Sequence, residues 1–191
     1  WGIQLGGLGQ DPGTTLAFSG LGAMAVVPVA LIAYAWLATL QGGAIADTPL
    51  DIFVLGFFLH AGIAALMELL LISPALGAYL GNSLLASPRL DYLIWGGALG
   101  SLLAGLHYWW PLMTGAMYSP GAARVGGSFY VLGLNLALIP RMMMGTRGVA
   151  QDMMAFEPGP TALSELSALG WLVMFCGLAV ILANLYASSW R

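Results

Sequence analysis

Residues 50–72 read LDIFVLGFFLHAGIAALMELLLI, a nearly unbroken apolar run. A helix of about 20 apolar residues is long enough to cross the hydrocarbon core of a bilayer. The run follows Asp47-Thr48-Pro49, where the proline suits the first turn of a helix, and it stops at Ser73-Pro74. The sequence therefore predicts a transmembrane helix over residues 50–72.

Other apolar runs lie on both sides of this one. They cover residues 15–40, 90–110, 128–144 and 162–186, and residues 1–8 have the character of the end of a further helix. We therefore expect an all-α fold, a polytopic transmembrane helix bundle. It would have five full spans plus the end of a sixth, in a single domain over residues 1–191.

The segments between these runs are less hydrophobic or rich in small residues. We expect residues 77–88 to form a re-entrant or interfacial loop, residues 115–127 a loop, and residues 151–160 the longest connection. Pro28 interrupts the first run, which a transmembrane helix tolerates when neighbouring groups satisfy the freed carbonyl. Small residues on the third run would let helices approach closely: Gly96, Gly97, Gly100 and Gly105.

The composition agrees with a membrane location. The chain is 60% hydrophobic and 7% charged, and its mean hydropathy is +0.89. Soluble domains carry about a quarter charged residues, so this composition excludes a soluble enzyme. The net charge of −3 offers no basic surface for nucleic acid. The chain begins with Trp1 and no charged segment precedes the first apolar run, so we expect no signal peptide.

His60 and His107 are the only histidines and the weak candidates for binding a cofactor. Two histidines could hold a haem if they faced each other at one depth of the bilayer. Neither has a histidine or acid three or four residues away, and a zinc or copper site needs three or four ligands. The alternative is that His60 is a hydrogen-bonded residue of the bundle and that His107 is an anchor at the membrane interface.

Glu68 is an acid deep in the run over residues 50–72. An ionisable side chain inside a membrane is expensive and often functional, so Glu68 could relay protons, with Arg141 as its counter-charge near the membrane surface. A proton path needs a chain of polar groups, and the residues around Glu68 are apolar. The alternative is a structural acid, protonated or hydrogen-bonded, that faces another subunit.

The remaining candidates for chemistry are few. Met142-Met143-Met144 and Met153-Met154 could bind a soft metal, but consecutive helical residues point in different directions, so we expect them to pack. The single Cys176 excludes a disulfide framework. The sequence has no phosphate loop, nucleophile elbow or paired-carboxylate motif, and we assign no catalytic and no metal-binding residue.

Three segments resemble subunit I of the haem-copper oxidases, the cytochrome c oxidase family. They are Tyr34–Gly43, with the sequence YAWLATLQGG; His107–Gly115, with the sequence HYWWPLMTG; and Gly133–Pro140, which matches the pattern Gly-x-Asn-Leu-x-x-x-Pro. Their order and spacing follow the C-terminal half of that family. The resemblance implies that the chain runs from within the seventh family helix through the twelfth, in a respiratory oxidase that uses haem and copper.

The ligands that the resemblance would bring are missing from this chain. The family's adjacent copper-binding histidines fall on Ile3 and Gln4, and its His-x-His, with one ligand for each haem, falls on Arg89-Leu90-Asp91. Iron and copper cannot persist without donor atoms of this kind. Three further positions are also changed: the His-Asp pair near magnesium falls on Gly81-Asn82, the proton-channel lysine on Ile32, and the arginine pair for the haem propionates on Gln151-Asp152.

The sequence therefore favours a non-catalytic, subunit-I-like component of a terminal oxidase complex. It would have a structural or assembly role, bind neither haem nor copper through the family's sites, and contact partner subunits and lipid in a bacterial inner membrane. Haem and copper could lie in partner subunits. One alternative is the C-terminal part of a split subunit I that reduces oxygen and pumps protons with ligands from a partner chain. Another is a proton or ion conduit that uses Glu68.

Overall fold

In the computed structural model, residues 11–190 are described, except residues 25, 42, 44–47 and 152–160. The regular structure of these residues is helical. The helices, in chain order, are α2 (Pro12–Met24), α3 (Val26–Thr39), α4 (Pro49–Ile72), α5 (Pro74–Leu80), α6 (Pro88–Asp91), the π-helix η1 (Tyr92–Leu99), α7 (Gly100–Thr114), α8 (Pro120–Thr146) and α9 (Thr161–Ser188).

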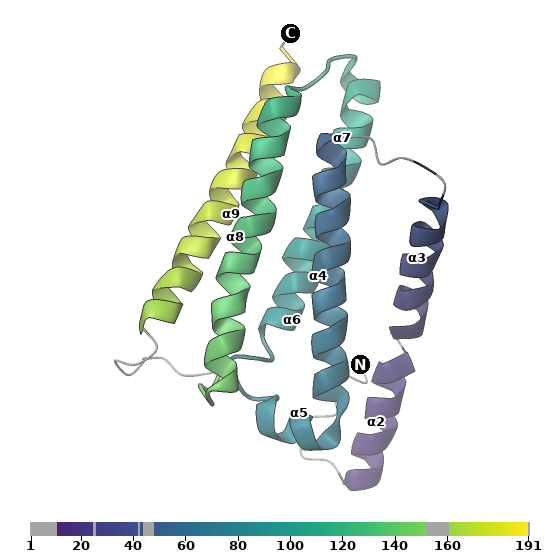
Figure 1. The fold of residues 1–191 in the computed structure, drawn as a ribbon, viewed down its shortest axis with the longest axis vertical. Helices are drawn as coiled ribbons and strands as arrows, with labels where there is room; N and C mark the ends of the chain where they lie inside the picture. Colours follow the sequence, from purple (N-terminus) through teal and green to yellow (C-terminus); the bar gives the residue numbers. More distant parts are fainter. Residues whose placement is uncertain (1–10, 25, 42, 44–47, 152–160, 191) are drawn as a thin grey trace.

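These helices form an elongated bundle, which confirms the predicted all-α transmembrane fold. Figure 1 shows α4, α8 and α9 running along its long axis, with α2 and α3 at one side. In the described chain 4 helices are long and apolar enough to cross a membrane: Leu16–Thr39, Pro49–Ile72, Pro120–Thr146 and Ala162–Ser188. The expected span over residues 90–110 is built from α6, η1 and α7, which follow one another without a break.

The first expected span, residues 15–40, is covered by α2 and α3. The proline nitrogen carries no hydrogen to donate, and its ring clashes with the carbonyl four residues earlier. For Pro28 that residue is Met24, where α2 ends, and α3 then begins at Val26. Residue 25 lies outside the described residues, and α2 and α3 together supply one candidate membrane span, Leu16–Thr39, with Pro28 in the first turn of α3. The expected end of a helix over residues 1–8 lies outside the described residues.

Two expected loops differ from the structure. Residues 77–88 were expected to form one loop, but α5 extends to Leu80 and the segment Ser83–Ala86 that follows it is buried. The backbone of this segment pairs with residues near Ala150, through Leu84 N to Val149 O at 2.9 Å. The fourth span begins at Pro120, not at residue 128, because Ser119 caps α8 and the small residues after it continue the helix.

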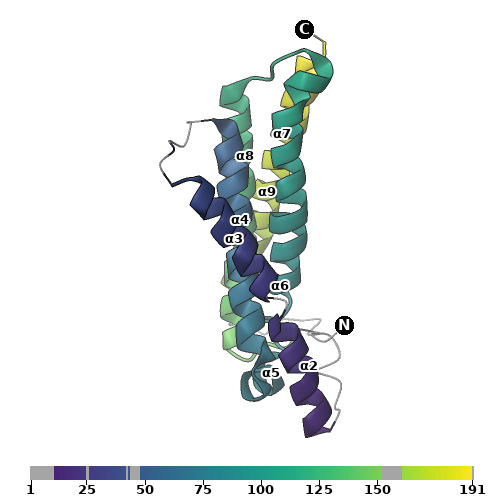
Figure 2. The same cartoon turned by 90° about the vertical axis from the view of Figure 1, so that its right-hand side faces the viewer.

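Helices α8 and α9 pack closely along their length through small residues. Gly133 and Gly170 face the partner backbone, at Met174 and Ala137 respectively, and a Cβ atom at either glycine would overlap it. Ser167 also donates a hydrogen bond across this contact to the carbonyl of Ala137, at 2.7 Å. Small residues at a helix contact let backbones approach within a membrane, so α8 and α9 form the closest pair of the bundle (Figure 2).

The buried face of α4 packs against the other side of α8 and against η1 and α7. Its buried residues recur at helical spacing: Phe53, Gly56, His60, Ala64 and Met67. The predicted close approach along the third span is confirmed at Gly96, where a Cβ atom would overlap the His60 side chain. These contacts bring polar side chains from α4, η1 and α8 together inside the bundle.

The close contact of α8 and α9 predicts opposite effects for two glycines of α8. Gly133→Ala places a Cβ atom against the Met174 backbone, while a Cβ atom at Gly121 meets nothing within 4 Å. Overpacking costs about 1–3 kcal/mol, whereas an alanine that fits gains up to about 1 kcal/mol of helix propensity. We expect Gly133→Ala to lower the free energy of unfolding and Gly121→Ala to leave it unchanged or raised. Unfolding in mixed detergent micelles, followed by circular dichroism, measures both; equal values for the two variants would contradict the packing.

Candidate functional site

The first polar group inside the bundle centres on Asn135 of α8. Its side-chain nitrogen donates to His60 Nε2 at 2.9 Å and to the carbonyl of Val131 at 2.8 Å. The hydroxyl of Tyr92 donates to Asn135 Oδ1 at 3.2 Å, and the Tyr92 ring stacks on His60 with 5.6 Å between ring centroids. Asn135 therefore links α4, η1 and α8. These contacts agree with the alternative in which His60 is a hydrogen-bonded residue of the bundle.

The π-helix η1 adapts the third span to this group. Gly96 packs against the His60 side chain, and the Tyr130 hydroxyl of α8 donates to the carbonyl of Trp95. A π-helix often occurs at functional sites, because its wider turn changes the backbone bonding pattern and the direction of side chains. Here it leaves room for the imidazole ring and offers a carbonyl to a neighbouring helix. Among the described residues, His60 Nδ1 has no hydrogen-bond partner.

His107 lies elsewhere in the bundle. Its Nδ1 donates to the carbonyl of Leu103 at 2.7 Å, and its ring packs between Phe53 and Tyr118. The side chain is buried within the bundle, and its expected role as an anchor at the membrane interface stays a prediction. Phe53 precedes His60 by seven residues on α4, about 10 Å along the helix axis. The structure therefore does not bring the two imidazoles together, and the described residues contain no cluster of three or more His, Cys, Asp or Glu side chains that could hold a metal ion.

A second polar group joins α6 to two neighbouring helices. Arg89 forms an ion pair with Glu68 of α4 at 3.3 Å, and both side chains are largely buried. Asp91 pairs with Arg141 of α8 at 3.0 Å, and Arg141 also donates to Ser87 Oγ at 3.0 Å. We call Glu68, Arg89, Asp91 and Arg141 the charge cluster. Each carboxyl group of the charge cluster is paired with one guanidinium group of the same chain.

This cluster corrects one expectation for Glu68. The expected counter-charge was Arg141, but Arg89 holds that position and Arg141 pairs with Asp91. The alternative of a structural acid that faces another subunit stays a prediction, although Glu68 has a partner, Arg89, within the chain. Glu68 Oε1 and Arg89 Nε have no further hydrogen-bond partner among the described residues. The apolar neighbours of Glu68 in sequence could not reveal a cation that another helix supplies.

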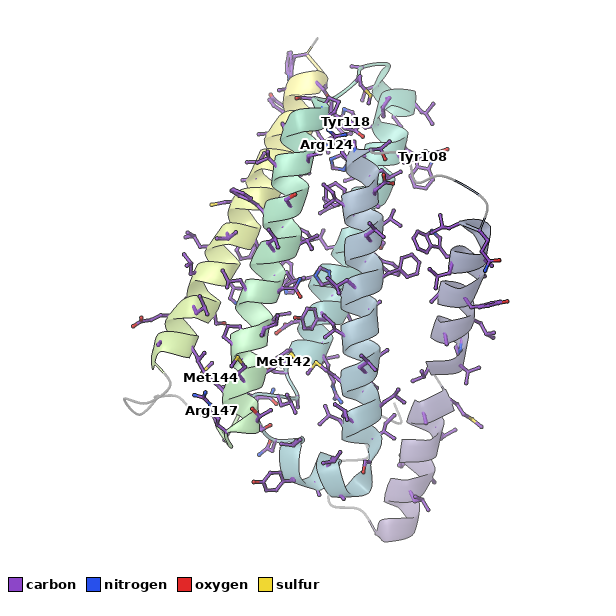
Figure 3. The ribbon with its side chains drawn as sticks, in the orientation of Figure 1. Tyr108, Tyr118, Arg124, Met142, Met144 and Arg147 are labelled. Carbon is purple, nitrogen blue, oxygen red and sulfur yellow. The ribbon has the colours of Figure 1, made fainter. Side chains whose placement is uncertain are left out.

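The remaining sequence candidates do not gather into a site. Figure 3 shows Met142 and Met144 on different sides of α8, near Arg147, while Tyr118 and Arg124 lie at the other end. Met144 is buried, and the partly buried Met142 packs against the hydrophobic core. Met153 and Met154, like Ile3, Gln4 and Asp152, lie outside the described residues.

Asn82 and Gln151 contact each other through their backbones. By the resemblance, both stand where the family has a functional residue. The amide of Gln151 donates to the carbonyl of Asn82 at 3.0 Å. Both side chains are exposed. Here the contact holds the buried segment 83–86 against the end of α8 rather than presenting donor atoms to a ligand.

The geometry around Asn135 predicts unequal effects for two of its members. Asn135→Leu leaves His60 Nε2 and the Tyr92 hydroxyl without partners inside the bundle, at a cost of about 1–3 kcal/mol for each buried group. Tyr92→Phe removes one hydrogen bond across the helices, for which about 0.6 kcal/mol is the average in membranes. We expect Asn135→Leu to destabilise the protein clearly more than Tyr92→Phe in micelle unfolding. A larger loss for Tyr92→Phe would show that Asn135 is not the centre of the group.

Comparisons with known proteins identify the family of this chain. A model of the family "Cytochrome C and Quinol oxidase polypeptide I" matches residues 5–180. Cytochrome c oxidase subunit 1 of Bacillus sp. (strain PS3) is 24% identical over 194 residues, which cover 99% of this chain and 31% of that protein. The corresponding protein of Yarrowia lipolytica is 23% identical over 186 residues, covering 97% of this chain and 35% of that one.

The solved structures show the same fold. A chain of a heme-copper terminal oxidase dimer determined by cryo-EM aligns with a TM-score of 0.72 and 17% identity, over 100% of this chain and 40% of that chain. This chain spans about a third of the length of the curated relatives it matches. Since the family model matches most of its length, the chain belongs to the cytochrome c and quinol oxidase polypeptide I family.

Proposed function

We propose that this chain is a non-catalytic membrane component of a respiratory electron-transfer complex of the cytochrome c oxidase type. Its role is structural or in assembly. Other integral membrane subunits surround it and, where the complex holds haem and copper, supply their ligands. The bacterial relatives, which include the subunit 1 of Alkalihalophilus pseudofirmus, support a location in a bacterial inner membrane.

The observation that carries this proposal is the pairing of Arg89 and Asp91. By the resemblance, these residues occupy the positions of the family's haem-binding histidines. Haem iron takes His, Cys, Met or Tyr side chains in proteins, and a guanidinium group has no acceptor atom to offer. Asp91 is held by Arg141 at 3.0 Å. The residues present at these positions do not fit a haem, and we assign them no electron-transfer step.

The same residues support a structural role. Arg89 and Asp91 tie α6 to α4 and to α8, so one short segment holds two helices of the bundle at a fixed depth. Removing one partner of a buried ion pair leaves an uncompensated charge, which costs about 3–5 kcal/mol. The cluster therefore makes the bundle depend on residues that cannot serve as haem ligands.

The motif residues that this chain retains also have structural partners. Asn135 holds the polar group described above, and Gly133 admits the backbone of α9. Trp110 donates from its indole nitrogen to Ser188 Oγ at 2.7 Å, joining α7 to the end of α9. Each of these contacts contributes to a helix bundle without requiring a bound metal or haem.

Haem and metal analysis tests the proposed function. We expect the purified chain, separated from its partners, to show neither haem absorbance nor stoichiometric copper or iron. The visible spectrum of the reduced pyridine complex and elemental analysis measure these quantities. A haem that is lost in His60→Ala or His107→Ala would contradict the proposal, because it would show that this chain supplies an iron ligand.

Charge reversal tests the role of the Glu68–Arg89 pair. Glu68→Arg places two cations together, so we expect it to reduce the amount of folded chain in the membrane sharply. The double variant Glu68→Arg with Arg89→Glu restores opposite charges and should recover most of that amount. The exposed Arg147→Glu is the matched control and should have little effect. If the double variant is no better than the single one, the pair does not hold α4 to α6.

A further inference from the structure

The partners of the Asn135 side chain fix the orientation of its amide group. The carbonyl of Val131 lies 2.8 Å from the amide nitrogen of Asn135, and a carbonyl can only accept a hydrogen bond. If the amide were turned over, Asn135 Oδ1 would meet that carbonyl, and two acceptors would face each other. The Tyr92 hydroxyl, 3.2 Å from Oδ1, suits the oxygen in its present place. The nitrogen of Asn135 therefore faces both Val131 and His60.

This orientation decides which nitrogen of His60 carries a hydrogen. The amide nitrogen of Asn135 is a donor with two hydrogens, one for the Val131 carbonyl and one for His60 Nε2 at 2.9 Å. His60 Nε2 must therefore accept, which uses its lone pair. The hydrogen bond at one ring nitrogen sets which nitrogen is protonated, so neutral His60 carries its hydrogen on Nδ1. A second hydrogen on Nε2 would point at the amide hydrogen of Asn135.

The space around the other ring nitrogen of His60 is closed. The side chain is fully buried, and Nδ1 has no hydrogen-bond partner among the described residues. Gly96 of η1 lies against it, so close that a Cβ atom at Gly96 would be 2.6 Å from Nδ1. The gap beside the ring is too small for a water molecule. Nδ1 therefore keeps its hydrogen and has no path along which to pass it on.

The side chains that face His60 carry no charge. The titratable ones are Tyr92 of η1 and Tyr130 of α8, whose phenol groups are neutral at and below neutral pH. On α4 itself Glu68 lies eight residues away, about 12 Å along the helix axis, and it is paired with Arg89. The other residues that line the gap beside the ring do not titrate: Phe53, Gly56 and Phe57 of α4, Gly96 of η1, Gly100 of α7 and Val131 of α8.

We infer that Asn135 holds His60 in the neutral Nδ1–H form and so closes its Nε2 to protons and to metal ions. A proton or a metal ion adds to the lone pair of an imidazole nitrogen, and at His60 Asn135 occupies that lone pair. His107 differs in this respect. Its Nδ1 donates to the carbonyl of Leu103 at 2.7 Å, so neutral His107 is the same tautomer, but its Nε2 has no partner among the described residues. The inference needs only these hydrogen bonds and does not rest on the proposed function.

Nitrogen NMR tests the form of His60. The full chain, with ¹⁵N at its two histidines, is purified in mixed micelles, and in His107→Gln the signals that remain belong to His60. We expect a hydrogen on His60 Nδ1 and none on Nε2, although the Nε2–H form of neutral histidine predominates in water. The spectrum should not change as the pH falls from about 7 to about 5, the range in which an exposed histidine gains a proton. A hydrogen on His60 Nε2 at either pH, in protein whose circular dichroism is unchanged, would overturn the inference.

Variants of the polar group show whether Asn135 sets the tautomer. Asn135→Asp replaces the amide donor by a carboxylate, which accepts, so His60 Nε2 should gain a hydrogen. Asn135→Leu removes the donor, and we expect the Nε2–H form to appear in a substantial fraction of the molecules. Tyr92→Phe is the matched control, because it keeps the bond from Asn135 to His60 and should leave the spectrum unchanged. The Nδ1–H signal of His107 shows that each variant is folded. If His60 Nε2 stays without a hydrogen in the folded variants at Asn135, the inference is wrong.

Discussion

Hydrocarbon offers no hydrogen bond to a protein, so each polar side chain inside a membrane bundle needs a partner within the protein. In this chain that constraint fixes how the helices meet. Asn135 joins α8 to α4 and η1 through His60 and Tyr92, while Arg89 and Asp91 join α6 to α4 and α8 through ion pairs. The two groups act at different depths, and together they restrain the third span against both of its neighbours.

Glycine makes these polar contacts possible because it lets the backbones come close enough. Gly96 yields space to the His60 ring, and Gly133 and Gly170 let α8 and α9 touch through their backbones. The result is a firm unit of α4, η1, α7, α8 and α9, to which α2 and α3 are attached by fewer contacts.

The apolar spans were predictable because hydropathy is a local property of the sequence. Local composition failed at residues 120–127, where small residues that suggest a loop instead begin α8. It also failed at the charge cluster, since Glu68 and Arg89 lie on different helices and only the fold brings them to 3.3 Å. The resemblance located Arg89 and Asp91 as altered ligand positions, but not the partners that each now has.

The central claim is that ion pairs, not haem ligands, occupy the positions of Arg89 and Asp91. A cryo-EM map of the intact membrane assembly, at a resolution that shows side chains, tests it most directly. The account predicts Arg89 against Glu68 and Asp91 against Arg141, with haem and copper, where present, held by residues of other chains. Iron or copper coordinated by any residue of this chain would contradict the account.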